Sequence, residues 1–119
     1  MDNNVLTVGS IVKTLALEVQ SGQELMFTEI KGGYSSDLLS DVMANGKKGD
    51  IWVTCQIHPN IIAVGVLKEM AGIIITGGRK PDAGMVEKAR TEKLIVMCSS
   101  LPSFEVAGKL WAMGVEGPR

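Results

Sequence analysis

Hydrophobic and polar positions follow two different patterns along the chain. Short uncharged runs rich in β-branched residues occur at 51–55, 73–76 and 94–98, and such runs predict buried strands. Between them, apolar residues recur three or four positions apart, which predicts amphipathic helices. The order of these patterns therefore indicates alternating strands and helices over most of the chain.

The N-terminal part begins with a helix predicted over residues 8–17. Thr7 is a suitable N-cap, and Val8, Ile11 and Leu15 fall at helical spacing behind it. Residues 18–22 then predict a short strand that runs into a turn. Residues 27–34 predict a second strand. Two adjacent glycines near its end make the strand prediction weaker.

From this point strands and helices alternate. The sequence predicts helices after Ser35 or Ser36 with Asp37 in the first turn, from Pro59 with His58 as a possible cap, from Pro81 and Asp82, and from Ser99, Ser100 or Ser103 to Gly114. This alternation predicts βαβ units and a three-layer α/β/α fold, with a mostly parallel sheet of four or five strands and helices on both faces. We expect one domain over residues 1–119, with 115–119 as a frayed tail.

Composition narrows the functional classes. The chain has 119 residues, with 12 Lys and Arg against 13 Asp and Glu, so its net charge of -1 offers no basic surface for nucleic acid. Cys55 and Cys98 lack the spacing of a metal site or a disulfide framework, so no metal is expected. The sequence shows no leader and no membrane-spanning run, and we expect a cytoplasmic protein with reduced thiols.

Polar residues follow each predicted parallel strand. Ligands of open α/β sheets bind beyond the carboxyl ends of the strands, where helix N-termini favour anions. The candidate ligand-binding residues are therefore Ser35, Ser36, Asp37, Thr54, Gln56, His58, Thr76, Gly77, Gly78, Arg79, Ser99 and Ser100. The alternative is that each loop is purely structural, because Ser and Thr also cap helices and Gly also makes turns.

Residues in two of these loops have two sharply different interpretations. Gly77 and Gly78 can let a backbone approach a ligand while Arg79 pairs with a carboxylate or phosphate, or they can form a simple strand-end turn. His58, the only histidine, can act as a switch or a base, or it can merely cap a helix.

Signatures of catalysis are missing from the sequence. It contains no P-loop, no G-x-G-x-x-G after a strand and no G-x-S-x-G elbow. Cys55 and His58 are three residues apart, but no orienting partner accompanies them. We therefore predict that the chain is not an enzyme, with no catalytic residues and no cofactor.

Several segments together resemble the DRTGG domain family. Residues 73–82 are similar to its signature region, and residues 34–43, 49–54, 56–58 and 104–106 also fit. Only the Thr-Gly-Gly part of the name-giving motif is present, at Thr76 to Gly78, since Ile74 and Ile75 replace an acid and an arginine.

The resemblance implies an accessory role. DRTGG domains are about this long, are similar to the N-terminal domains of the HPr kinase/phosphorylase group, and occur beside CBS domains and within some phosphate acetyltransferases. Free-standing copies are associated with hydrogenase or other redox gene clusters. The resemblance therefore implies that the chain acts on a separate partner protein, with a redox or hydrogenase-associated protein as one candidate.

Three hypotheses follow. The first is a non-catalytic regulatory module that binds a small anionic metabolite or nucleotide and modulates a partner protein. The second is a homodimeric interaction or scaffold domain without a small-molecule ligand, with an apolar contact patch around Leu110, Trp111 and Met113. The third is a small transferase or hydrolase that uses His58.

Overall fold

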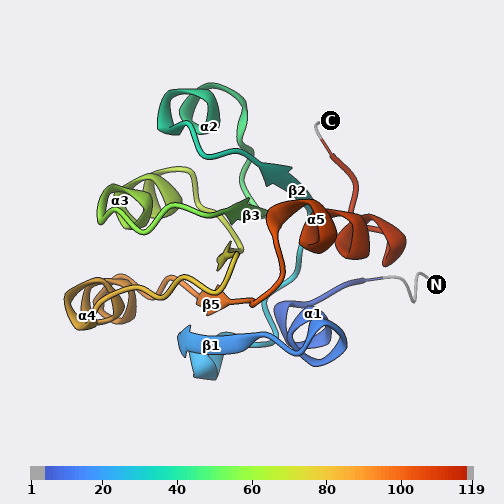
Figure 1. Ribbon diagram of the computed structural model, residues 1–119, viewed down its shortest axis with the longest axis horizontal. Coiled ribbons are helices and arrows are strands. Elements are labelled where there is room, and N and C mark those ends of the chain that lie inside the picture. Colours follow the sequence, from blue (N-terminus) through green and yellow to red (C-terminus); the bar gives the residue numbers. More distant parts are fainter. Residues whose placement is uncertain (1–4, 118–119) are drawn as a thin grey trace.

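A computed structural model describes residues 5–117, which form five strands, five α-helices and one short 3-10 helix (Figure 1). In chain order these are α1 (Val8–Leu15), β1 (Glu18–Ser21), η1 (Gln23–Leu25), β2 (Gly32–Ser35), α2 (Leu39–Asn45), β3 (Asp50–Thr54), α3 (Asn60–Leu67), β4 (Gly72–Ile75), α4 (Ala83–Thr91), β5 (Val96–Cys98) and α5 (Ser103–Ala112).

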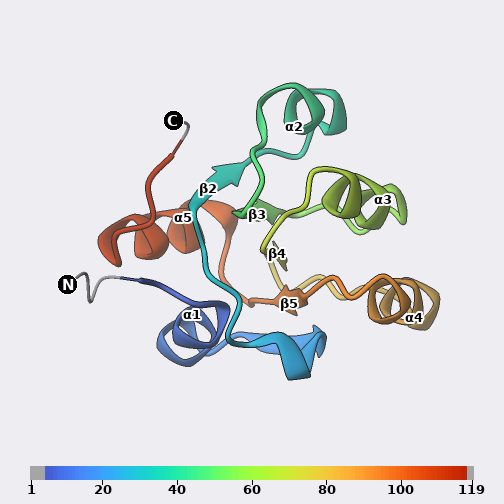
Figure 2. The ribbon, with the colours of Figure 1, turned by 180° about the vertical axis from the view of Figure 1, so that it is seen from behind.

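The strands form one sheet in the order β1-β5-β4-β3-β2. The pairs β2–β3, β3–β4 and β4–β5 are parallel, and β1 joins β5 antiparallel. Helices α1 and α5 cover one face, and α2, α3 and α4 cover the other (Figures 1 and 2). The predicted three-layer, mostly parallel α/β fold is confirmed. Among the helices of residues 5–117, none is both long and apolar enough to cross a membrane.

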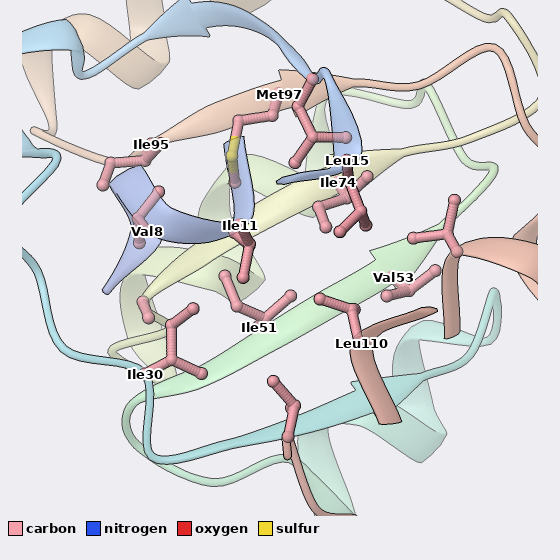
Figure 3. Packing of buried hydrophobic residues seen from close by; sticks show 14 residues of the cluster. Val8, Ile11, Leu15, Ile30, Ile51, Val53, Ile74, Ile95, Met97 and Leu110 are labelled. Carbon is pink, nitrogen blue, oxygen red and sulfur yellow. The ribbon is translucent and has the colours of Figure 1, made fainter. Parts of the chain in front are cut away.

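The alternation of side chains along each strand divides the core into two clusters. Ile51 and Val53 of β3 and Ile74 of β4 face α1 and α5, where they pack with Ile11 and Leu110 (Figure 3). The strands can be apolar on both faces because helices cover both.

The second cluster lies between the sheet and helices α2 to α4. Trp52 is fully buried there, and its indole N–H donates to the carbonyl of Ser36 at 2.9 Å. In α3, a Cβ added to Gly65 would lie 3.0 Å from side-chain atoms of both Ile73 and Leu94. The glycine therefore lets α3 lie close against the sheet.

The strand predicted over residues 27–34 is mostly wrong, because only Gly32–Ser35 joins the sheet. The preceding segment pairs with the start of α1 instead. Thr7 bridges Glu29, and the amide of Ile30 donates to the carbonyl of Leu6 at 2.8 Å. These contacts satisfy the backbone of the segment away from the sheet.

Two further boundaries differ from the prediction. Helix α2 begins at Leu39 rather than directly after Ser35 or Ser36, so Asp37 lies before the helix and not in its first turn. At the C-terminus, Val115 is buried and the carbonyl of Glu116 accepts a hydrogen bond from the amide of Gly33 at 2.8 Å. The predicted fraying at 115–119 is thus wrong for 115 and 116, while 118–119 lie outside the described residues.

Candidate functional site

Four loops meet at the carboxyl edge of the parallel strands. They follow β2, β3, β4 and β5 and comprise residues 36–38, 55–59, 76–82 and 99–102, and we call this edge the rim. The parallel register of neighbouring strands places the ends of β2 to β5 at one edge of the sheet. The candidate residues predicted from the sequence therefore gather at one edge. Their binding of a ligand stays a prediction.

Asp37 joins the first two loops. Its Oδ1 accepts a hydrogen bond from the hydroxyl of Thr54 at 2.8 Å and another from the backbone amide of Cys55 at 2.9 Å. The side-chain amide of Gln56 donates to the carbonyl of Asp37 at 3.2 Å. Asp37 is thus occupied with the neighbouring loop rather than with the N-terminus of α2, which explains the later start of that helix.

Direct hydrogen bonds join the third loop to the fourth loop and to the start of α5. The hydroxyls of Thr76 and Ser103 lie 2.6 Å apart, and the amides of Gly77 and Gly78 donate to the carbonyls of Leu101 and Ser99 at 2.8 and 2.9 Å. Thr76 also bonds to the end of β3, the strand that leads into the second loop. Its amide donates to the carbonyl of Thr54 at 2.9 Å. Hydrogen bonds therefore connect all four loops along the rim.

Gly77 and Gly78 both have the backbone conformation that favours glycine. Their φ angles are 75° and 76°, and a Cβ added to either would meet nothing within 4 Å. The left-handed conformation, and not a lack of space, therefore requires glycine at these positions.

The candidate residues divide into a buried and an exposed group. Thr54, Thr76 and Ser99 are buried, and their hydroxyls bond within the protein, so they are positioning residues. Ser36 is half-buried, and its hydroxyl accepts from the amide of Leu38. The residues that reach solvent are Ser35, Asp37, Gln56, His58, Gly77, Gly78, Arg79 and Ser100.

Charge at the rim is mixed. The pKa of Asp37 lies below its ordinary value, chiefly because the amide of Cys55 donates to it, and the charge of Arg79 adds to this effect. Arg79 is exposed, and it takes part in none of the hydrogen bonds or ion pairs found within residues 5–117. Its guanidinium therefore has donors available to a ligand.

Nucleophilic chemistry finds no support at the rim. Burial raises the pKa of the Cys55 thiol, and the neighbouring Asp37 raises it further, so the thiolate form is disfavoured near neutral pH. Over residues 5–117, no group of three or more His, Cys, Asp or Glu side chains could hold a metal ion.

His58 contacts the start of α3. Its ring Nδ1 accepts a hydrogen bond from the backbone amide of Asn60 at 3.1 Å, while the ring lies exposed to solvent. The N-cap position of α3 is Pro59, but the bond to His58 still satisfies the first amide of the helix, which is a structural role.

A small hollow opens at the β1 end of the rim. Its volume is about 210 Å³, and its lining includes Gly78, Ser99 and Ser100 together with Glu18 and Lys80. The ammonium of Lys80 pairs with the carboxylate of Glu18 across this hollow. Neither charged residue was predicted from the sequence. Glu18 reaches the rim because β1 runs antiparallel and pairs Glu18 with Cys98, a pairing that the sequence pattern does not reveal.

Other hollows lie away from the rim. An apolar one of about 260 Å³ lies between β2 and α5, beside Tyr34 and Trp111. Another of about 400 Å³ lies at the opposite edge of the sheet, beside Lys31, Lys48 and Glu69. The rim hollow is smaller than these, but three predicted site residues line it (Gly78, Ser99 and Ser100), whereas the apolar hollow beside Trp111 is lined by one, Ser35.

Comparison with known proteins identifies the fold. No protein-family model and no curated protein matches the chain. The crystal structure of the CBS and DRTGG domains of the regulatory region of Clostridium perfringens pyrophosphatase, complexed with the activator diadenosine tetraphosphate, matches with a TM-score of 0.71 at 21% identity. The match covers 86% of this chain and 44% of that chain, so this chain spans less than half of the solved one. The likeness supports the DRTGG-like fold that the sequence resemblance predicted.

Proposed function

We propose that this chain is a non-catalytic regulatory module that binds a small anionic metabolite or nucleotide at the rim and thereby modulates a partner protein. The observation that carries the proposal is the rim itself, where hydrogen-bonded loops hold Arg79 beside Gly77 and Gly78, and Arg79 makes no hydrogen bond or ion pair with residues 5–117. The likeness to a regulatory region crystallised with a nucleotide activator supports the same function class.

The size of the hollow sets what the rim can hold. Binding sites for drug-sized ligands are roughly 300–1,000 Å³, whereas the rim hollow is about 210 Å³. It therefore suits a phosphate or carboxylate group rather than a complete dinucleotide. The rest of a larger ligand would lie across the exposed loops, where Arg79 can approach its charge.

The mixed charge favours a nucleotide over a simple anion. Arg79 can bind phosphate oxygens, because a guanidinium forms charge-assisted hydrogen bonds with them, whereas the ammonium of Lys80 is already paired with Glu18. Asp37 would repel the same phosphates, but its carboxylate is exposed and has acceptor positions beyond those used by Thr54 and Cys55, so it can accept a further hydrogen bond from a sugar hydroxyl. A ligand that carries both phosphate and hydroxyl groups matches this set.

Binding can act on a partner only if the ligand prefers one state of the module over another. The loops at the rim are tied to each other, so a ligand that moves residues 76–82 would also move the loop that begins α5. We propose that the partner is a separate protein. From the sequence resemblance, a redox or hydrogenase-associated protein is one candidate. We place the module in the cytoplasm.

A thermal-shift screen tests this function. The protein is heated with ATP, diadenosine tetraphosphate, pyrophosphate and citrate in turn, at matched ionic strength. Binding at a hundredfold excess over Kd stabilises the folded state by about 2.7 kcal/mol, which shifts Tm by several degrees in a domain of this size. The same screen on Arg79→Ala should lose the shift. No shift with any of these ligands would contradict the proposal.

A second candidate function is a homodimeric interaction domain without a small-molecule ligand. The observation that favours it is the exposure of large aromatic side chains on α5, where Phe104 is 89% and Trp111 is 67% exposed. The patch predicted around Leu110, Trp111 and Met113 needs correction, because Leu110 is buried in the core and Met113 is partly buried against it.

A further inference from the structure

The solvent face of α5 is apolar. Val106 and Leu110 are buried and mark the side that packs on the sheet. At 100° per residue, Phe104, Gly108 and Trp111 lie on the opposite side, and Glu105 and Lys109 both fall on one flank. A helix with apolar residues on both sides is usually covered on both, so this face is suited to a contact with another molecule.

Gly108 lies at the centre of this face. Glycine is unfavourable inside a helix, and a Cβ added here would meet nothing within 4 Å. Packing within the chain therefore gives no reason for glycine at this position, unlike at Gly65. A reason would exist if the backbone of another helix approached α5 closely at this point.

We propose that a second copy of this chain covers the face, with its α5 packed antiparallel across Gly108 about a two-fold axis. Such an interface must be self-complementary, and the residues on α5 meet this condition. When the two Gly108 residues face each other, Phe104 of one copy lies opposite residue 112 of the other. Trp111 is the neighbour of residue 112, so Phe104 of each copy comes next to Trp111 of the other. The interface would thus contain two equivalent aromatic pairs around a glycine contact.

The charges agree with this arrangement. The two-fold axis brings the Glu105 and Lys109 flanks of both copies to the same side. Glu105 of one copy then lies about 3 Å along the helix axis from Lys109 of the other, at 1.5 Å rise per residue, so the two can pair. The two Lys109 residues are also about 3 Å apart along the axis, so the charges run Glu-Lys-Lys-Glu, and two attractive pairs outweigh one repulsive pair. Parallel packing about a two-fold axis would instead place the two charged flanks on opposite sides of the interface, where they could not pair.

The size of the face predicts a weak dimer. Two aromatic side chains that are mostly exposed offer roughly 300 Å² on each copy, whereas a standard interface buries roughly 800 Å² on each side. The apolar hollow of about 260 Å³ beside Trp111 adds concave surface along the β2 side of α5. The dimer should therefore form reversibly and depend on protein concentration. The inference gives the second candidate function its contact surface and does not depend on the rim.

Light scattering after size exclusion, over a range of concentrations, measures this association. The wild type should convert from monomer to dimer as its concentration rises towards about 1 mM. Trp111→Ala should weaken the dimer at least tenfold, because each substitution removes the ring from both copies. Phe27→Ala is the matched control, since Phe27 is 70% exposed and lies outside α5, and it should leave the dimer unchanged.

Two further variants test the arrangement of the helices. Glu105→Lys should weaken the dimer, and Glu105→Lys with Lys109→Glu should restore it. Gly108→Ala should weaken the dimer without lowering Tm, since it improves the helix of each copy. A wild type that stays monomeric throughout, or a Phe27→Ala effect as large as that of Trp111→Ala, would overturn the proposal. A monomer that still binds nucleotide would leave the rim function standing.

Discussion

The carboxylate of Asp37 accepts the hydroxyl hydrogen of Thr54 at 2.8 Å, and this bond joins the loop after β2 to the end of β3. Seventeen residues separate the two positions in the sequence. Because Thr54 is buried and its backbone carbonyl also accepts from Thr76, the bond connects an exposed charge to the centre of the sheet. The order of the rim therefore depends on Asp37.

Asp37→Asn should destabilise the protein by about 1 kcal/mol near neutral pH, which is the net contribution expected of a solvent-accessible hydrogen bond of this kind. The pKa of Asp37 is lowered in the folded state, so its contribution is present above the unfolded value of about 4 and is lost as pH falls through the folded value. Urea unfolding at a series of pH values measures the difference between the two proteins.

The matched control is Glu24→Gln, which also removes an exposed negative charge but lies in η1, away from the rim. Its unfolding free energy should follow that of the wild type at every pH. The unfolding free energy of Asp37→Asn is compared with that of the wild type at each pH. If the difference is the same in acid as at neutral pH, the charge of Asp37 does not hold the loops.

Cys55 should react slowly with alkylating reagents near neutral pH. Burial and Asp37 raise the pKa of its thiol, and the thiolate is the reactive form. Asp37→Asn should accelerate the reaction, because it removes a negative charge that disfavours the thiolate. Mass spectrometry after timed iodoacetamide treatment measures the rate, with Cys98 in the same molecule as the internal reference. An unchanged ratio of Cys55 to Cys98 labelling in Asp37→Asn would count against this electrostatic link.

Gly78→Ala should destabilise the protein by about 1–2 kcal/mol, the cost of placing a Cβ in the left-handed region. The space around the glycine is open, so the whole effect comes from backbone strain. Gly108→Ala, also in open space but in a helix with ordinary φ, should instead stabilise each monomer by about 0.5–1 kcal/mol. Thermal unfolding of dilute protein compares them, and equal shifts in the two variants would refute the strain argument.

The sequence predicted the strands and helices best where the pattern was strongest. The apolar runs at β3 and β4 and the helix expected to begin beside Asp82 were confirmed, and Asp82 is the N-cap of that helix, α4. The prediction failed over residues 27–31, because Thr28 and Ile30 find backbone partners in residues 6–8 that no local pattern reveals. Tertiary pairing, rather than strand propensity, decides the structure of that segment.

The candidate site was also predictable only in part. The polar loops after each parallel strand could be found from the sequence, because parallel strands end at one edge of a sheet. Glu18 and Lys80 could not be found, since their meeting depends on the antiparallel pairing of β1 with β5. The exposure of Phe104 was not predicted, because the sequence reading did not settle which side of α5 packs on the sheet.

Arg79 should carry most of the affinity for a phosphate-bearing ligand at the rim. A charge-assisted hydrogen bond contributes about 1.5–3 kcal/mol, so Arg79→Ala should weaken binding roughly 10- to 150-fold. Arg90→Ala is the matched control, because Arg90 is exposed on α4 and pairs with Glu87 away from the rim. Its affinity should equal that of the wild type.

Calorimetric titration of diadenosine tetraphosphate and ATP into the wild type, Arg79→Ala and Arg90→Ala is the most direct measurement of the rim's function. We expect saturable binding of at least one nucleotide to the wild type and to Arg90→Ala, and its loss or marked weakening in Arg79→Ala. Absence of binding to the wild type, or binding that Arg79→Ala leaves unchanged, would contradict a nucleotide site at the rim.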